Sequence, residues 1–335
     1  MSDRVYKVVV VGMGKRGKHH AAAFHANPRF EVAGICDIDT ARLEAAAADL
    51  GNPKIGTDAA ALAAEIRPDI FCFATMPNIR YDMIKIGVDN GVKLIASHQH
   101  RYGEHYQKVK EIIASGAIGR VQTVYGHATG WMMHMMTHMI DYMSWFNGSY
   151  DADWVMGQAS GTGKFSDIHA SPDYIAGVIQ YSNGVRGYVE TGAGAPDVPE
   201  VDYWWRKCRI GAQGTEGFAE TLTGGGWRAV TMDGVFSGPG CMNYDLDMPP
   251  YIADMAAWLD DDGAVHPCNI EAAYKGFEMM MGICRSVVSR GQIALPLGDG
   301  PAEIDALQGI LGGTPALLSM EGNLKEYPNG VMVNG

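Results

Sequence analysis

The chain has 335 residues, of which 47% are hydrophobic, and this length predicts two domains with sizeable cores. Its formal net charge of −12, without any cluster of Lys or Arg, argues against a nucleic-acid partner. No apolar run is long enough to span a membrane and no signal-peptide pattern is present, so we expect a cytoplasmic protein that does not associate with membranes. The six cysteines show no CxxC spacing, which argues against a zinc ribbon or a disulfide framework.

The first forty residues contain the strongest functional pattern. A strand-like run ends at Gly12, which with Gly14 and Gly17 forms G-x-G-x-x-G before an alanine-rich helix. In a dinucleotide-binding fold these glycines allow a tight turn, close approach of a pyrophosphate and close helix packing. A second predicted strand ends at Asp37, whose carboxylate would accept hydrogen bonds from ribose hydroxyls. The alternative is a glycine-rich turn that binds no nucleotide.

The residues around this motif favour NAD over NADP. Asp37 would repel the 2′-phosphate of NADP, and the neighbouring Ile38 carries no charge to hold one. Lys15 and Arg16 lie in the loop between the glycines. They either contribute to phosphate binding or are solvated charges at the start of a helix.

The chain then alternates between helices and strands, as a doubly wound sheet requires. The sequence predicts helices over 41–51, 59–66, 81–91 and 104–116, and strands over 54–58, 69–78 and 92–102. Residues 75–78 form a turn at the carboxyl end of the strand over 69–78, where open sheets bind ligands. We predict cofactor contacts at the loop, the acid and this turn: Gly12, Met13, Gly14, Lys15, Arg16, Gly17, Asp37, Ile38, Thr75, Met76, Pro77 and Asn78.

A second domain is predicted to begin near residue 120. We divide the chain into a dinucleotide-binding domain over 1–119, a substrate-binding and oligomerisation domain over 120–315, and a tail over 316–335. An Asn-Gly turn at 183–184 predicts a hairpin over 173–194, and helices over 251–261, 269–291 and 302–307 are expected to pack on the sheet of this domain. Trp204 and Trp205 would suit a sugar ring, although sheet packing or a subunit interface is the commoner role of such aromatics.

Two histidines, His134 and His138, are spaced one helical turn apart in a methionine-rich run. They are candidates for an acid/base pair, for a metal site or for simple packing. Two histidines at this spacing can hold zinc, but a third ligand is needed. Asp141 is near in sequence, and His127, His100 and His169 qualify only if folding brings them together. We predict no metal, and we expect the five methionines between 132 and 139 to fill the core.

These stretches resemble the Gfo/Idh/MocA family, named for glucose–fructose oxidoreductase and inositol dehydrogenase. The similar segments are VVVGMGKRGKHH, VAGICDID, FATMPN, HQHRY, SGAIGRVQTV and HMIDYMSWFNG. The resemblance implies an α/β protein with an N-terminal Rossmann domain and a C-terminal α/β domain that contains a large open, mainly antiparallel sheet. It also implies NAD as cofactor, a sugar, cyclitol or related polyol as substrate, and a homodimer or homotetramer built through that sheet.

The resemblance also implies roles for single residues. His138 corresponds to the family histidine that takes the proton of the reacting hydroxyl, and Asp141 to the acid that follows it. His134 stands where the family has an aspartate, and would share the proton relay or bind a neighbouring hydroxyl. The family segment that lines the substrate pocket corresponds to His100, Arg101 and Tyr102. Arg101 would clamp a carboxylate or hydroxyls, or would form an interdomain salt bridge.

One departure from the family pattern is large. No Glu-Lys-Pro sequence occurs in the chain, and one strand–helix unit of the pattern is missing before SHQHRY. The lysine of that motif contacts the reacting hydroxyl in the family. Two classes of function therefore stay open: an NAD-dependent dehydrogenase with His138 and His134 as catalytic residues, or an NAD-binding protein without ordinary hydride transfer. The second class includes a glycosidase or lyase, metal-assisted through His134 and His138, and an inactive family member.

Overall fold

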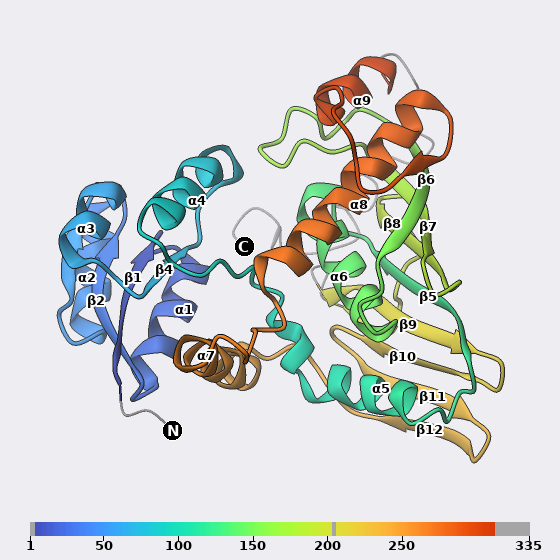
Figure 1. Cartoon of the computed structure of the whole chain (residues 1–335), viewed down its shortest axis with the longest axis horizontal. Helices are drawn as coiled ribbons and strands as arrows, with labels where there is room; N and C mark the ends of the chain where they lie inside the picture. The colour runs from blue at the N-terminus through green and yellow to red at the C-terminus, as the bar shows by residue number, and fades with distance from the viewer. Residues whose placement is uncertain (1–3, 203–205, 312–335) are drawn as a thin grey trace. The chain divides into compact units, whose positions relative to one another are not determined.

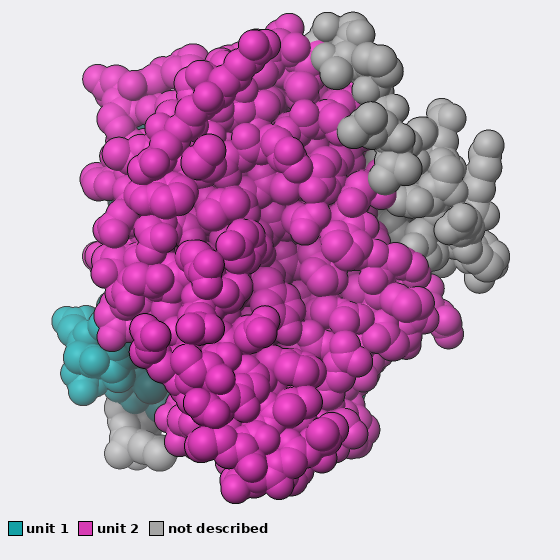
Figure 2. All heavy atoms as spheres, turned by 90° about the vertical axis from the view of Figure 1, so that its right-hand side faces the viewer, with its two compact units in different colours: residues 1–102, 243–270 teal, residues 103–242, 271–335 magenta. Residues whose placement is uncertain are grey.

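The computed structural model describes residues 4–202 and 206–311 of the chain. The chain folds into two compact units, coloured separately in Figure 2. Unit 1 comprises Met1–Tyr102 and Asn243–Ile270, and unit 2 comprises Gly103–Met242 and Glu271–Gly335. These units differ from the sequence-based division at residue 119, because the chain returns to unit 1 late in its length. Trp204, Trp205 and the predicted tail over 316–335 lie outside the described residues.

Unit 1 contains a four-stranded parallel sheet with helices between its strands. The strands are β1 (Tyr6–Val11), β2 (Phe30–Cys36), β3 (Lys54–Gly56) and β4 (Ile70–Phe73), in the order β3-β2-β1-β4. The helices are α1 (Lys15–Ala26), α2 (Thr40–Asp49), α3 (Ala59–Ile66) and α4 (Arg80–Asp89), with a short 3₁₀ turn η1 (Pro77–Ile79). Successive valines of β1 are buried on both faces, as a central strand covered on each side by helices requires. The Rossmann prediction is confirmed.

The strand predicted over 92–102 does not form in the described structure. This segment makes a single bridge, between Ile95 and Asn269, and ends in the 3₁₀ helix η2 (Gln99–Tyr102). Its backbone groups find partners outside the sheet, because Ala96 donates to the carbonyl of Cys268 and Leu94 accepts from Ile270. The described part of the sheet therefore ends at β4, where a six-stranded doubly wound sheet would continue.

Helix α7 (Tyr244–Asp260) packs in unit 1, and the prediction that this region covers the second sheet was wrong. Met248, Tyr251 and Ile252 on its buried side join the same apolar cluster as Phe24 of α1. The Tyr6 hydroxyl of β1 also donates to Asp260 at the end of α7, at 2.7 Å. Helix α7, which is distant in sequence, thus adds apolar side chains to the core formed by the first hundred residues.

Unit 2 contains a nine-stranded, mainly antiparallel sheet in the order β12-β11-β10-β9-β5-β8-β7-β6-β13. Its strands are β5 (Val121–Ala128), β6 (Ala152–Ser160), β7 (Tyr174–Tyr181), β8 (Arg186–Gly192), β9 (Cys208–Gly214), β10 (Phe218–Leu222), β11 (Gly226–Thr231), β12 (Gly234–Gly238) and β13 (Ile293–Ala294). Strands β5 and β8 pair in parallel. The predicted Asn-Gly hairpin is confirmed, since β7 and β8 pair antiparallel and Gly184 has a φ of +84°.

The helices of unit 2 are α5 (Glu104–Ala114), the π turn η3 (Met132–Met136), α6 (Thr137–Phe146), α8 (Ile270–Ser289) and α9 (Glu303–Leu311). Figure 1 shows α5, α6 and α8 on one side of the sheet, and Figure 2 views the unit from the other side. The core between them contains the predicted methionines: Met132, Met136 and Met139 are buried, and Met133 and Met135 pack against them. The fold class is confirmed, and the homo-oligomer stays a prediction.

Two further predictions concern membrane spans and disulfide bonds. Among residues 4–202 and 206–311, no helix is both long enough and apolar enough to cross a membrane. All six cysteines are free thiols, and four of them are buried. Burial raises the pKa of Cys72, Cys208 and Cys284 to about 12, so these thiols stay protonated at neutral pH.

His127 on β5 makes stability depend on pH. Burial, helped by the nearby Arg209 guanidinium, lowers the pKa of His127 to about 4. In the unfolded chain its pKa returns to about 6.5, so between these values the unfolded state binds more protons and stability falls as the pH falls. Between pH 7 and pH 4, we expect the unfolding free energy of His127→Gln to fall by about 1–2 kcal/mol less than that of the wild type. Urea unfolding at several pH values measures this, with His25→Gln at the exposed end of α1 as control. Parallel pH profiles for His127→Gln and the wild type would contradict the assignment.

Candidate active site

The glycine loop between β1 and α1 has the geometry of a dinucleotide-binding turn. Gly12 has a φ of +89°, and a Cβ there would lie 2.7 Å from the carbonyl oxygen of Ala74. A Cβ on Gly17 would overlap the carbonyl oxygen of Gly12, so α1 lies too close to the loop for any side chain at this position. Around Gly14, which caps α1, a Cβ would meet nothing within 4 Å. The loop is thus tight at its first and third glycines and open at its second.

Asp37 joins the end of β2 to this loop. One carboxylate oxygen accepts a hydrogen bond from the backbone N–H of Met13 at 2.6 Å, and the other accepts from that of Asp39 at 3.0 Å. A carboxylate has about four acceptor positions, so two of them stay available for hydroxyl donors. The Ile38 side chain beside this acid is 93% exposed and carries no charge.

The turn after β4 lies against the same loop. The built Cβ of Gly12 would come within 3.6 Å of Cγ2 of Thr75, so the two segments are in contact. The Thr75 hydroxyl oxygen is buried and has no hydrogen-bond partner in the described part of the chain. Met76 is half exposed, and Pro77 and Asn78 begin the 3₁₀ turn η1. A buried hydroxyl without a partner among the described residues, beside the glycine loop, fits a polar group of a bound cofactor.

Lys15 and Arg16 occupy the first turn of α1 and are exposed. The Arg16 guanidinium lies 4.2 Å from the ring centroid of Tyr244 on α7, a cation–π contact. Tyr244 also stacks on His19 at 5.2 Å. Burial and then the Arg16 charge lower the pKa of His19, so this imidazole is neutral at physiological pH. Arg16 therefore packs on α7, while Lys15 is the exposed cation of the loop.

The three predicted substrate-binding residues of η2 are bonded within unit 1, where His100 and Arg101 are buried and Tyr102 is partly buried. His100 Nδ1 is 3.0 Å from the Asp247 carboxylate, and Arg101 donates to the carbonyl of Pro267 at 3.3 Å. The Tyr102 hydroxyl donates to Asp254 at 2.7 Å. Burial lowers the pKa of His100 although Asp247 opposes this shift. These bonds attach η2 to α7 and to the segment after it, and a role in substrate binding stays a prediction.

His138 lies in the first turn of α6, in unit 2. Its Nδ1 is 3.5 Å from the Tyr142 hydroxyl one turn later, and the Tyr142 ring makes an edge contact with Tyr106 of α5 at 5.0 Å. Asp141 of the same helix is buried, with 4% of its surface exposed. The imidazole is thus oriented from one side by a tyrosine that is itself held in the core.

His134 lies in a π turn rather than in the helix that the spacing predicted. The wide turn η3 precedes α6, so His134 and His138 are not one ordinary helical turn apart. The His134 ring stacks on His169 at 4.2 Å with an interplanar angle of 18°, and lies nearly parallel to Trp131. His169 Nδ1 is 3.4 Å from the Asp167 carboxylate. Single-turn π segments are frequent at functional sites, which favours a role for this turn.

The loop between β6 and β7 contains His169, the stacking partner of His134. Ser171 is fully buried, accepts from the N–H of Met133 at 3.2 Å and donates to the carbonyl of His169 at 2.7 Å, which fastens the loop to the π turn. Lys164 of the same loop lies 4.4 Å above the Trp131 ring. The sequence named His169 only as a conditional ligand, and no spacing signal pointed to Lys164 or Asp167.

The described residues contain no group of three or more His, Cys, Asp or Glu side chains that is arranged to hold a metal ion. The metal-assisted alternative through His134 and His138 therefore finds no ligand set in this part of the chain. Lys93, the one lysine near the missing motif, is ion-paired with Asp262 at 2.6 Å. It does not replace the lysine that the family pattern places at the reacting hydroxyl.

The glycine loop, the acid at the end of β2 and the sheet order define the domain type. Residues 6–98 match the Gfo/Idh/MocA family model, which is described as an oxidoreductase family with an NAD-binding Rossmann fold. The chain carries the NAD-binding domain of this family. The predicted family and NAD as its cofactor are therefore confirmed for this domain, and the match ends at His98, within the segment whose predicted strand does not form. No curated protein is similar enough in sequence to match.

Solved structures extend the similarity to both units of the chain. An NAD-binding oxidoreductase from Klebsiella pneumoniae has a TM-score of 0.69 at 16% identity, covering 89% of this chain and 100% of its own. An Agrobacterium radiobacter oxidoreductase in complex with NAD⁺, L-tartaric acid and magnesium has a TM-score of 0.68 at 17% identity, with 86% and 98% covered. The scyllo-inositol dehydrogenase of Lactobacillus casei, with bound NAD(H) and scyllo-inositol, has a TM-score of 0.63 at 14% identity, with 87% and 99% covered. At these identities the similarity establishes the Gfo/Idh/MocA fold alone.

The second and third glycines of the loop allow a matched test. Gly17→Ala would force α1 away from the loop, and we expect it to cost more than about 3 kcal/mol of unfolding free energy. Gly14→Ala adds a methyl group in open space, so its stability should stay within about 1 kcal/mol of the wild type. Its NAD⁺ affinity should nevertheless fall at least about tenfold, because the methyl occupies the pyrophosphate path. Denaturant unfolding and calorimetric titration with NAD⁺ measure both effects. Unchanged NAD⁺ affinity in Gly14→Ala would exclude this loop as the binding site.

Proposed function

We propose that the protein is an NAD-dependent oxidoreductase that transfers a hydride between a hydroxyl of a sugar, cyclitol or related polyol and nicotinamide. The observation that carries the proposal is the glycine loop, which is open at Gly14. Beside the loop lie the Thr75 hydroxyl, which has no hydrogen-bond partner among the described residues, and the Asp37 carboxylate, which has two unused acceptor positions. These three features lie in one unit and suit a pyrophosphate and an adenosine ribose.

The cofactor would be held by residues of three segments of unit 1. The N–H groups at the start of α1 would bind the pyrophosphate, with Lys15 as the adjacent cation. Asp37 would accept from the ribose hydroxyls while its bond to Met13 fixes its orientation. The nicotinamide ring supplies the hydride acceptor when the cofactor is bound.

The substrate class is supported by the solved structures. They include inositol dehydrogenases from Lactobacillus casei and, as a putative enzyme, from Sinorhizobium meliloti, and the latter has a TM-score of 0.64 at 18% identity. A ring with several hydroxyl groups needs several polar partners for orientation. The π turn and the following helix offer such partners in the imidazoles of His134 and His138.

His138 is the proposed acid/base residue. Oxidation of a hydroxyl releases a proton together with the hydride, and an imidazole accepts that proton near neutral pH. The Tyr142 hydroxyl beside Nδ1 would fix the ring so that Nε2 faces the substrate. His134, stacked on His169, is proposed to bind a neighbouring hydroxyl or to relay the proton, with Asp167 orienting His169.

Replacement of His138 tests this assignment. We expect His138→Gln to lower kcat about 10²- to 10⁴-fold, the usual contribution of general acid–base catalysis, while NAD⁺ affinity stays unchanged. NADH absorbance is followed with a panel of inositols, aldoses and sugar acids, and His25→Gln serves as the control. Activity that survives in His138→Gln would remove this residue from the mechanism.

A second candidate function is favoured by the missing Glu-Lys-Pro motif. A protein that binds NAD without ordinary turnover would be a glycosidase or lyase, or an inactive family member. Tight NAD⁺ binding without NADH formation on any compound of the panel would favour this candidate. Substrate-dependent reduction of NAD⁺ would exclude it and would show that the lysine is dispensable.

The preference for NAD over NADP depends on the surface beside Asp37. Ile38 is almost fully exposed, so Ile38→Arg should leave the fold unchanged and place a guanidinium where a 2′-phosphate would lie. We expect the ratio of NADP⁺ to NAD⁺ affinity to rise about tenfold, measured by calorimetric titration. Ile38→Gln, which has similar length and no charge, is the control. An equal change in both variants would contradict an electrostatic origin.

A further inference from the structure

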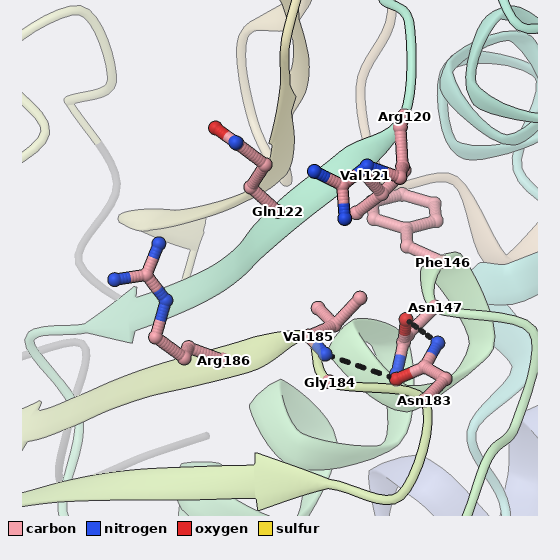
Figure 3. A pocket seen from close by; sticks show the side chains of 9 residues that line it. All are labelled: Arg120, Val121, Gln122, Phe146, Asn147, Asn183, Gly184, Val185 and Arg186. Carbon is pink, nitrogen blue, oxygen red and sulfur yellow. Dashed lines mark hydrogen bonds between the residues drawn. The ribbon is translucent and has the colours of Figure 1, made fainter.

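A polar cleft of about 480 Å³ lies in unit 2 where strands β5 and β8 begin. The two strands run in parallel, with Thr123 of β5 opposite Arg186 of β8, so their first residues meet at the same end of the sheet. The end of α6 and the β7–β8 turn complete the cleft (Figure 3). Its volume falls within the range of small-molecule sites, which is about 300–1,000 Å³.

Two arginines give the cleft its charge. Arg120 precedes β5 and Arg186 begins β8, and Figure 3 shows both guanidinium groups projecting from these neighbouring strands. Neither has an ion-pair partner within residues 4–202 and 206–311, and the residues that line the cleft include no acid. The chain as a whole is acidic, with a net charge of −12 from 38 acidic residues and 26 Lys and Arg. The cleft is thus an uncompensated positive site on an acidic protein.

The rest of the cleft is built from fixed polar and apolar groups. The amide nitrogen of Asn183 donates to the amide oxygen of Asn147 at 2.9 Å, and the Asn183 amide oxygen accepts from the backbone N–H of Val185 at 3.2 Å. Figure 3 shows these two amides bonded to each other beneath Arg120. Each amide nitrogen carries two hydrogens, so donors stay available for a ligand. Phe146 and Val185 are almost fully buried and give the floor an apolar part.

The backbone of Arg120 is also held in place. Its N–H donates to the Thr215 hydroxyl at 3.1 Å, and its carbonyl accepts from the N–H of Thr215 at 3.1 Å. The base of this arginine is therefore ordered before any ligand arrives, which lowers the entropic cost of binding. Only the long side chain has to be positioned.

We propose that this cleft binds a small phosphate monoester. Two guanidinium forks from adjacent strands suit a dianion with three terminal oxygens, because each fork can donate two hydrogen bonds. The amides of Asn147 and Asn183 would donate to the organic part, and the apolar floor would contact its carbon atoms. A simple carboxylate engages one fork fully, so it binds more weakly than the monoester.

The cleft is separate from the proposed active site. Strand β5 runs from the cleft to Ala128, after which Trp131 and His134 follow, and β8 runs in the same direction to Gly192. Eight strand residues span about 25 Å at about 3.3 Å per residue. The histidine cluster and the two arginines therefore lie at opposite ends of the same pair of strands.

The test is a calorimetric titration of the full chain with inorganic phosphate, glycerol 2-phosphate and acetate at pH 8 and constant ionic strength. We expect one saturable site, with glycerol 2-phosphate binding more tightly than phosphate and acetate more weakly than both. Arg120→Gln and Arg186→Gln should each weaken phosphate binding about tenfold, and the double variant should abolish it. Arg290→Gln, at an exposed arginine of unit 2 outside the cleft, should bind as the wild type does.

The outcomes separate the cleft from the glycine loop, which also attracts phosphate. Binding that persists in the Arg120→Gln/Arg186→Gln variant and is lost in Lys15→Gln would place the anion at the loop and overturn the proposal. Absence of saturable binding in the wild type would overturn it as well, and so would acetate binding as tightly as glycerol 2-phosphate. Circular dichroism of each variant shows whether a loss of binding is a loss of folding, and wild-type NAD⁺ affinity in the double variant keeps the two sites distinct.

Discussion

The close approach of helix α1 to the glycine loop is the constraint on which unit 1 depends. No side chain fits at Gly17, since a Cβ there would overlap the carbonyl of Gly12. Because the helix lies this close, its N-terminus points along the loop, and the loop in turn comes close enough to β2 for Met13 to donate to Asp37. One missing methyl group thus places the phosphate-binding end of the helix and the ribose-binding acid in a single arrangement.

The core of unit 1 is completed by residues from outside its four-stranded sheet. The segment after α4 would complete a longer sheet, but its backbone bonds to residues 268–270 instead. Helix α7 then buries Met248, Tyr251 and Ile252 against the apolar side of α1 and β1. Polar residues of the same helix hold η2, through Asp247 to His100 and Asp254 to Tyr102. His100 and Tyr102, which the family resemblance assigns to substrate binding, thus also hold η2 to α7.

Unit 2 places different chemistry at the two ends of its parallel strand pair. At the carboxyl end of β5 the chain enters the π turn, where an imidazole stack and the adjacent His138 provide hydrogen-bond donors and acceptors. At the starting ends, two arginines without acidic partners create a positive cleft. Parallel pairing produces this separation, because it gathers both strand starts at one edge and both strand ends at the other.

The sequence by itself determined the features that local spacing controls. The tight glycine turn after β1, the position of Asp37 at the end of β2 and the Asn-Gly hairpin follow the sequence prediction, because each depends on a few consecutive residues. The strand predicted over 92–102 and the placement of α7 were wrong, because hydrogen bonds to residues more than 160 positions away decide the first and an apolar surface formed by α1 decides the second. The stack of His134 on His169 and the position of Arg120 and Arg186 in one cleft were decided only by the tertiary structure. No sequence period relates those residues: Ser171 holds the β6–β7 loop to the π turn, and the parallel pairing of β5 and β8 places both arginines at one end of the sheet.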